Sequence, residues 1–283
     1  ACSGWMCFIL FHTKNLTKDN LARGMGYVLA ACNIGILLGF FASATLYEHF
    51  GMFMMCLLSV IGGSTATLVA ITLKEKDEPN KVKPKISNLL EVVKNKRLWF
   101  FSVIAVIQQG ILMGTAMSFS NEVANSLGAA PWQIGIMNMT MTGSYAASCF
   151  LSSTRIALRI GPGILMTLSQ ICMAMYCILM VSLENVYMLI PIQVLLGSTG
   201  GMVFSWCSAE AISQIEAYRR STALSIFQSM FAIGMTAVPI MAGYLFNQTG
   251  TLDTAFFFQA ALAFLGAIAT AIYYARRRML RRA

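Results

Sequence analysis

The stretch "CNIGILLGFFASATLYEHFG", Cys32–Gly51, decides how this sequence folds, because a later stretch nearly repeats it. In "SMFAIGMTAVPIMAGYLFNQTG", Ser229–Gly250, Gly234 takes the place of Gly35 and Gly250 takes the place of Gly51. Both stretches carry small residues at intervals within an uncharged run and end on a polar turn with Gly. A chain that repeats such a unit is built from two related halves.

The composition is that of a membrane protein. Hydrophobic residues make up 57% of the 283 residues and charged residues 11%, against roughly 25% charged in soluble domains. The uncharged runs each reach the length of about 20 residues that a helix needs to cross a bilayer. In lipid the backbone must satisfy its own hydrogen bonds, so we predict an all-α polytopic membrane protein. The runs are Gly24–Tyr47, Phe50–Leu73, Leu98–Asn121, Val123–Thr154, Ile160–Leu183, Asn185–Ala209, Ser221–Leu252 and Thr254–Ala275.

The first residues, "ACSGWMCFILFHTK", form an apolar run that is too short to span a bilayer and lacks the features of a signal peptide. We interpret this run as the end of a helix that begins upstream, and we expect the sequence to be truncated at its N-terminus.

The basic residues fall in alternate loops. If the C-terminus is cytoplasmic, all 20 Lys and Arg lie on the cytoplasmic side, and the opposite loops carry Glu48, Glu122, Glu184 and Asp253. Cytoplasmic loops are enriched in Lys and Arg, so the net charge of +9 indicates orientation in a membrane and not nucleic-acid binding. We expect a multi-pass protein of the plasma (inner) membrane with its C-terminus in the cytoplasm.

One long polar segment, Lys74–Arg97, separates the spans. Its first half has mixed charge and two prolines, as flexible linkers do. In its second half Asn88 precedes Glu91 by three residues and apolar residues recur at helical spacing, which predicts a short amphipathic helix on the membrane surface. We therefore predict four parts: residues 1–73 as the remainder of an N-terminal bundle, 74–97 as a cytoplasmic linker with this helix, 98–275 as a six-helix C-terminal bundle, and 276–283 as a basic cytoplasmic tail.

Several motifs in this order resemble the major facilitator superfamily, from the end of its helix four through helix twelve. "GILLGFFASATL", Gly35–Leu46, is similar to the fifth-helix signature, although Phe40 replaces its Pro, and Ser43 and Ala44 replace its Gly pair. "STRIALRIGPG", Ser153–Gly163, is similar to the cytoplasmic turn between helices eight and nine. The resemblance implies two six-helix bundles that alternate about a central site. It further implies that helices one, four, seven and ten line a central cavity.

Polar residues on the helices that correspond to seven, eight, ten and eleven are the candidates for this cavity. Buried amides are costly in lipid and must point inward, although Gln108 and Gln109 could instead bond neighbouring helices. The substrate-cavity candidates are Gln108, Gln109, Thr115, Asn138, Thr142, Tyr145, Gln193, Ser225 and Gln228.

Small residues let helices approach closely, and a helix-internal proline can kink a helix. On this basis we assign helix-packing or hinge roles to Gly35, Gly39, Gly110, Gly114, Gly197, Gly201, Gly234, Pro239 and Gly243. Asn33 is interpreted as a packing partner, and the charged group around Glu210 and Arg219 as either a gate or a solvated loop.

These features predict a secondary active transporter that moves a small, uncharged or weakly polar solute by alternating access, possible roles being metabolite or drug efflux. The 20 methionines favour an adaptable binding wall, whereas the missing Pro and Gly pair around Phe40 count against an ordinary drug antiporter. The alternative is a non-transporting membrane receptor or assembly subunit of the same fold. The sequence contains no catalytic, phosphate-binding or metal-ligating motif. We therefore expect no enzyme activity, no cofactor, no metal and no nucleic acid partner. We expect the protein to be a monomer in the lipid bilayer.

Overall fold

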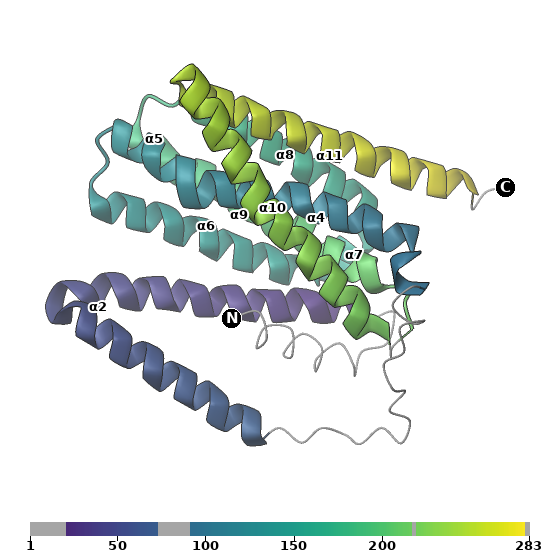
Figure 1. Cartoon of the computed structure of the whole chain (residues 1–283), viewed down its shortest axis with the longest axis horizontal. Coiled ribbons are helices and arrows are strands. Elements are labelled where there is room, and N and C mark those ends of the chain that lie inside the picture. The colour runs from purple at the N-terminus through teal and green to yellow at the C-terminus, as the bar shows by residue number, and fades with distance from the viewer. Residues whose placement is uncertain (1–20, 73–90, 217–218, 281–283) are drawn as a thin grey trace.

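A computed structural model describes residues 21–72, 91–216 and 219–280, and within these ranges the regular elements are all helical (Figure 1). The prediction of an all-α protein is therefore confirmed. The elements in chain order are α2 (Leu21–Thr72), α4 (Lys96–Gly114), the π-helix η2 (Thr115–Phe119), α5 (Ser120–Ser126), α6 (Pro131–Ser152), α7 (Arg155–Ile160), α8 (Pro162–Val181), α9 (Val186–Ile212), α10 (Arg220–Thr249) and α11 (Leu252–Leu280).

Two predictions lie outside the described residues. The helix end within residues 1–20 is one of them, and the amphipathic helix of the linker, which falls mainly on residues 73–90, is the other. The linker is described from Glu91 onward, where Val92 is buried against the helical core.

Helix α2 consists of two segments that meet at Gly51. This glycine has φ 66° and ψ −168°, which interrupts the helical backbone, and glycine reaches positive φ without steric cost. The chain therefore reverses direction between the two expected spans (Figure 1). The second segment carries strongly exposed side chains such as Phe53 at 77% and Ile71 at 76%.

Six helices of the described chain are long and apolar enough to cross a membrane: Phe50–Thr72, Lys96–Gly114, Pro162–Val181, Val186–Ile212, Arg220–Thr249 and Leu252–Met279. Arg23–Gly39 is a shorter apolar helix. Helix α6 coincides with a predicted span but is not among the six, because Gln133, Asn138 and neighbouring Thr and Ser residues lower its hydropathy. The predicted span whose hydropathy falls below that of the six thus holds three of the cavity candidates, Asn138, Thr142 and Tyr145.

Local sequence explains where most of these helices begin and end. Asn95 Oδ1 accepts hydrogen bonds from the backbone N–H groups of Arg97 and Leu98, which caps α4. Asn185 caps α9 in the same way through the N–H of Tyr187. Helix α10 ends at Gly250, which adopts a left-handed conformation with φ 72°.

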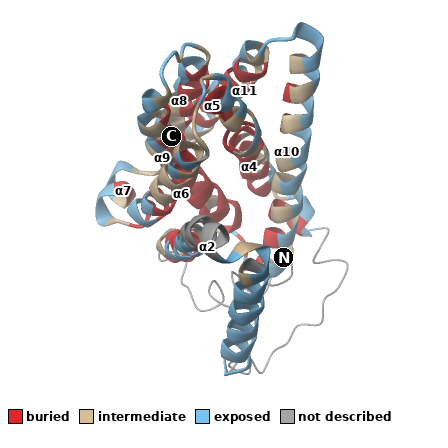
Figure 2. Cartoon of the chain, turned by 90° about the vertical axis from the view of Figure 1, so that its left-hand side faces the viewer, coloured by how far each residue is buried: buried red, intermediate tan, exposed pale blue. Residues whose placement is uncertain are grey.

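Close helix contacts in the C-terminal part occur at glycines. A Cβ added to Gly201 would lie 2.4 Å from the Tyr145 carbonyl oxygen, which is closer than a normal contact, so α9 and α6 meet backbone to backbone there. Gly110 of α4 faces Val238 of α10 in a similar contact. Figure 2 shows that the buried residues gather where α4, α6, α8 and α9 face one another.

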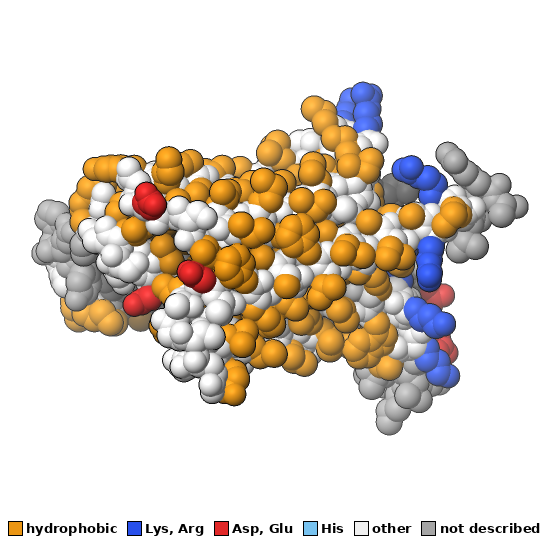
Figure 3. Space-filling model, turned by 90° about the horizontal axis from the view of Figure 1, so that it is seen from above, with side chains coloured by type: hydrophobic (Ala, Val, Ile, Leu, Met, Phe, Trp, Pro, Cys, Tyr) orange, Lys and Arg blue, Asp and Glu red, His pale blue; other side chains and the backbone are white. Residues whose placement is uncertain are grey.

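Charged side chains are segregated along the molecule. Figure 3 shows Lys and Arg side chains collected at one end, with some acidic side chains among them, and further acidic side chains without basic neighbours near the other end. Phe100 of α4 stacks on Tyr273 of α11 with ring centroids 4.3 Å apart, so the first turns of α4 lie beside the basic end of α11. The separation agrees with the alternation of basic and acidic loops in the sequence.

The predicted span Leu98–Asn121, which corresponds to helix seven of the superfamily, is not a regular α-helix throughout. It widens into the π-helix Thr115–Phe119 before α5 continues it. The Thr115 hydroxyl donates to the Ile111 carbonyl at 2.7 Å, and the Ser118 hydroxyl donates to the Met113 carbonyl at 3.4 Å. π-Bulges inside helices occur frequently at functional sites, so this segment makes the half of the helix away from Lys96 a candidate functional region.

Candidate functional site

The strongest candidate site is a polar junction where α4, α6 and α9 meet. Gln108 of α4 is 1% exposed, and its Nε2 donates to the Gly200 carbonyl of α9 at 3.2 Å. A Cβ added to Gly200 would lie 3.1 Å from the Tyr145 ring and 3.4 Å from Gln108 Nε2. The absence of a side chain at Gly200 thus brings the amide and the phenol ring together. We call Gln108, Tyr145 and Gly200 the central junction.

The central junction retains an open hydrogen-bonding group. Gln108 Oε1 is buried and has no hydrogen-bond partner among the described residues. Gln109, Gln170 and Gln259 also have a buried amide oxygen without a partner among the described residues, and Gln108 differs from them in its position between α4, α6 and α9. A buried polar atom without a partner costs about 1–3 kcal/mol, and a bond accepted by Gln108 Oε1 would remove that cost. Water or a solute that carries a donor can supply that bond.

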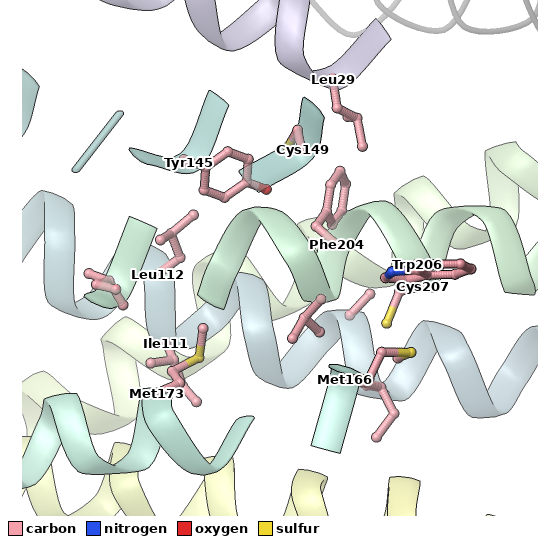
Figure 4. Packing of buried hydrophobic residues seen from close by; sticks show 14 of the residues in the cluster. Leu29, Ile111, Leu112, Tyr145, Cys149, Met166, Met173, Phe204, Trp206 and Cys207 are labelled. Atoms are coloured by element: carbon pink, nitrogen blue, oxygen red, sulfur yellow. The ribbon is translucent and has the colours of Figure 1, made fainter. Parts of the chain in front are cut away.

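The surroundings of the junction are apolar and sulfur-rich. Figure 4 shows Tyr145 and Cys149 of α6 lying between α2 and α9, with Leu29 and Phe204 close by. The Cys149 thiol lies 3.6 Å from the Gly201 carbonyl. This environment suits a solute with an apolar body and few polar groups, because a hydrophobic wall supplies contact area while the amide fixes orientation.

A second polar cluster, which we call the outer cluster, lies in the half of the bundle away from the basic end. The Ser120 and Tyr176 hydroxyls are buried and 2.7 Å apart, and Thr115 and Gln193 are further polar side chains near Tyr176. Gln193 is fully buried, and neither atom of its amide has a hydrogen-bond partner among the described residues. The cluster joins the π-helix region to α8 and α9.

The remaining predicted cavity residues are more dispersed. Asn138 Nδ2 donates to Asn121 Oδ1 at 3.2 Å, and the Thr142 hydroxyl donates to the Asn138 carbonyl at 2.9 Å. Gln109 is 8% exposed and belongs to neither cluster. On α10, Ser225 is exposed and bonds its own helix through the Ser221 carbonyl, while Gln228 is half-buried.

The glycine and proline positions fall into two groups. A Cβ would overlap a neighbouring helix or side chain at Gly110, Gly114, Gly197, Gly201 and Gly234. In contrast, nothing in the described chain lies within 4 Å of a Cβ at Gly35, Gly39 or Gly243. Pro239 lies inside α10, which continues through it, and α9 contains a second internal proline, Pro191.

Asn33 is half-buried and donates to the Leu29 carbonyl of its own helix at 2.8 Å.

A buried ionic group lies at the basic end of the bundle, and sequence reasoning missed it. Arg97, which ends the linker, is 8% exposed and forms an ion pair with Glu210 at the end of α9, while its Nε donates to the Glu210 carbonyl at 3.0 Å. Arg277 of α11 approaches the same carboxylate at 3.9 Å. In the sequence Arg97 resembles the other basic residues of the linker. The one feature that sets it apart is that it lies two residues after Asn95, the capping residue at the start of α4.

Two further polar contacts were also missed. Gln170 of α8 donates to the Thr270 hydroxyl of α11 at 3.0 Å, and Tyr176 belongs to the outer cluster described above. Gln170 and Tyr176 are the two large polar residues of the otherwise mostly apolar helix α8. A rule that every buried amide or phenol needs a partner could have selected them.

The comparison with known families agrees with this architecture. A family model described as Major Facilitator Superfamily matches residues 104–283. Among curated proteins, no sequence matches the chain.

Proposed function

The chain belongs to the Major Facilitator Superfamily, a family of membrane transporters, and from this we propose that it is a secondary active transporter that moves a small solute by alternating access. The family match covers the residues of the central junction and of the outer cluster. It also covers Glu210 and Arg277 of the buried ionic group, whose third member, Arg97, precedes the matched residues. Integral, multi-pass membrane insertion is supported by the same match together with the six long apolar helices.

The observation that carries the proposal is the unsatisfied amide oxygen of Gln108 at the meeting point of three helices. In the proposed mechanism the solute donates a hydrogen bond to Gln108 Oε1 and packs its apolar part against the Tyr145 ring. The junction contains no charged side chain, so the proposed solute is uncharged or weakly polar. Transport, efflux of metabolites or drugs included, leaves the solute chemically unchanged.

Other parts of the same proposal concern placement and organisation. We propose that residues 98–275 act as one six-helix unit, that residues 1–73 belong to the opposing unit, and that residues 74–97 and 276–283 lie in the cytoplasm at the plasma membrane. The proposed protein works as a monomer, because the solute path runs between the two units of one chain.

The test begins with a ligand screen on purified protein in detergent. Uncharged metabolites and amphipathic drugs are ranked by the rise in thermal midpoint that they cause, since a ligand that binds only the folded protein stabilises it. A compound that raises the midpoint is then loaded into proteoliposomes, and its exchange across the membrane is measured. Concentration-dependent exchange above protein-free liposomes supports transport. Binding with no exchange under any ion gradient would favour a receptor role instead.

A further inference from the structure

An apolar groove of about 580 Å³ lies between α4 and α11, away from the central junction. Its wall includes Trp99, Val103 and Ile107 on α4 and Leu265 on α11, and Lys96 stands at one end. The groove is open to the surroundings of the bundle, since Val103 is 46% exposed and Leu265 is 60% exposed. In a membrane protein a groove of this kind faces the acyl chains.

The length of the groove matches one leaflet. Lys96 and Ile107 are at its ends along α4, and at a helical rise of 1.5 Å per residue the distance between them is about 16 Å. The hydrocarbon core of a bilayer is about 30 Å thick, so the groove covers about half of it. One acyl chain of a phospholipid in the nearer leaflet has the depth to fill it.

The end of the groove has the chemistry of the membrane interface. Trp99 is 37% exposed and its Nε1 donates to the Val93 carbonyl at 2.6 Å, and Trp is enriched at the headgroup level of membranes. Lys96 is exposed beside it. The stack of Phe100 on Tyr273 brings the last turns of α11 to the same place, and Arg276, one turn beyond Tyr273, is exposed.

We propose that this groove is a binding site for an anionic phospholipid from the leaflet at the basic end of the bundle. The headgroup phosphate pairs with Lys96, Arg276 adds to the positive potential at the groove end, and one acyl chain lies between α4 and α11. Basic pockets between transmembrane helices bind anionic headgroups in this manner. The site is distinct from the solute junction and does not depend on the proposed transport activity.

The test is photocrosslinking of the full chain in lipid nanodiscs. Phosphatidylglycerol and phosphatidylcholine with the same photoactivatable acyl chain are compared at equal content, and the labelled peptides are identified by mass spectrometry. We expect phosphatidylglycerol to label residues 99–107 and 265–269 about fivefold more than phosphatidylcholine does, the factor expected for one basic residue near an anionic group. In Lys96→Gln this preference falls toward one, whereas Lys94→Gln, a nearby exposed lysine that does not line the groove, keeps it.

A second variant tests the acyl-chain part of the site. Val103→Trp fills the groove and lowers labelling of these peptides by both lipids, while labelling of α8 peptides stays unchanged. Each variant is first shown to have native helicity and a single elution peak. Equal labelling by the two lipids in the native chain, or labelling confined to peptides outside α4 and α11, overturns the proposal. An equal effect of Lys94→Gln and Lys96→Gln also overturns it, because the attraction would then be that of a diffuse basic surface.

Discussion

The side chain of Gln108 on α4 donates a hydrogen bond to the carbonyl of Gly200 on α9, 92 residues later in the chain, at 3.2 Å. The bond uses only half of the amide, because Gln108 Oε1 is buried with no hydrogen-bond partner in the described part of the chain. Gly200 also allows the Tyr145 ring to approach. The geometry of this junction depends on the missing Cβ at Gly200.

Gly200→Ala is expected to lower solute binding more than it lowers stability. The added Cβ would lie 3.1 Å from the Tyr145 ring, so the ring must shift by a few tenths of an ångström. Ala also favours the helix by about 1 kcal/mol relative to Gly, which offsets part of the strain. We expect a several-fold loss of solute affinity with a small change in thermal midpoint. Gly135→Ala, where nothing lies within 4 Å, is the matched control and should change neither affinity nor packing.

The helix contact at Gly110 gives a prediction for stability. Gly110→Val places new methyl groups against Val238 of α10 and should destabilise the protein by about 1–3 kcal/mol, the usual cost of overpacking. Gly243→Val is in a helix of the same bundle but has open space around its Cβ. The thermal midpoint in detergent measures both. If the two variants lose the same stability, the α4–α10 contact is not close packed.

The ion pair of Arg97 and Glu210 should contribute more stability than the pair of Arg219 and Glu91. Arg97 and Glu210 are 8% and 14% exposed, whereas Glu91 is 57% exposed. Removing one partner of a buried pair costs about 3–5 kcal/mol, and an exposed pair contributes about 0–1 kcal/mol. Because Glu210 is not completely buried and also has Arg277 nearby, we expect Arg97→Gln to cost about 2–3 kcal/mol.

Two controls accompany the Arg97 variant. Arg219→Gln should shift the thermal midpoint little, and the exchanged pair Arg97→Glu with Glu210→Arg should recover part of the lost stability. A larger loss in Arg219→Gln than in Arg97→Gln would contradict this ranking, because the exposed pair with Glu91 would then contribute more stability than the buried pair with Glu210.

The orientation of the chain can be measured with single cysteines on a background in which the native cysteines are replaced. If the basic loops are cytoplasmic, a membrane-impermeant thiol reagent added to sealed cells labels position 122 and does not label position 155. After the cells are opened, both positions react. Labelling of 155 and protection of 122 in sealed cells would reverse the proposed topology.

Much of the helical architecture could be predicted from the sequence, because long uncharged runs have few alternatives in lipid. The reversal at Gly51 also followed from a polar turn that ends in glycine. The π-helix could not be predicted, since "TAMSF" contains no residue that distinguishes a wide turn from an α-helix. It depends on how the neighbouring helices pack.

The candidate site was predicted in part, for a related reason. Buried amides such as Gln108 and Gln193 were selected because lipid excludes them. Which amides meet depends on the rotation of each helix about its axis, and apolar runs with little amphipathicity do not encode that rotation. Ser225 is exposed in the structure and stays a predicted cavity residue. The pairing of Arg97 with Glu210 was missed for the same reason.

The measurement that tests the central claim most directly compares Gln108→Leu with Gln170→Leu in proteoliposomes, with a solute found by the stability screen. Both glutamines are buried, and each donates one hydrogen bond to another helix, Gln108 to Gly200 of α9 and Gln170 to Thr270 of α11. Each also has an Oε1 without a partner among the described residues, so the two differ in that only Gln108 lies at the central junction. We predict that Gln108→Leu lowers the exchange rate and the solute affinity about tenfold or more, equivalent to about 1.4 kcal/mol at the site. Gln170→Leu should lose stability and keep solute affinity near that of the native chain. Unchanged exchange in Gln108→Leu, or equal losses in both variants, would contradict the assignment of the solute site to the central junction.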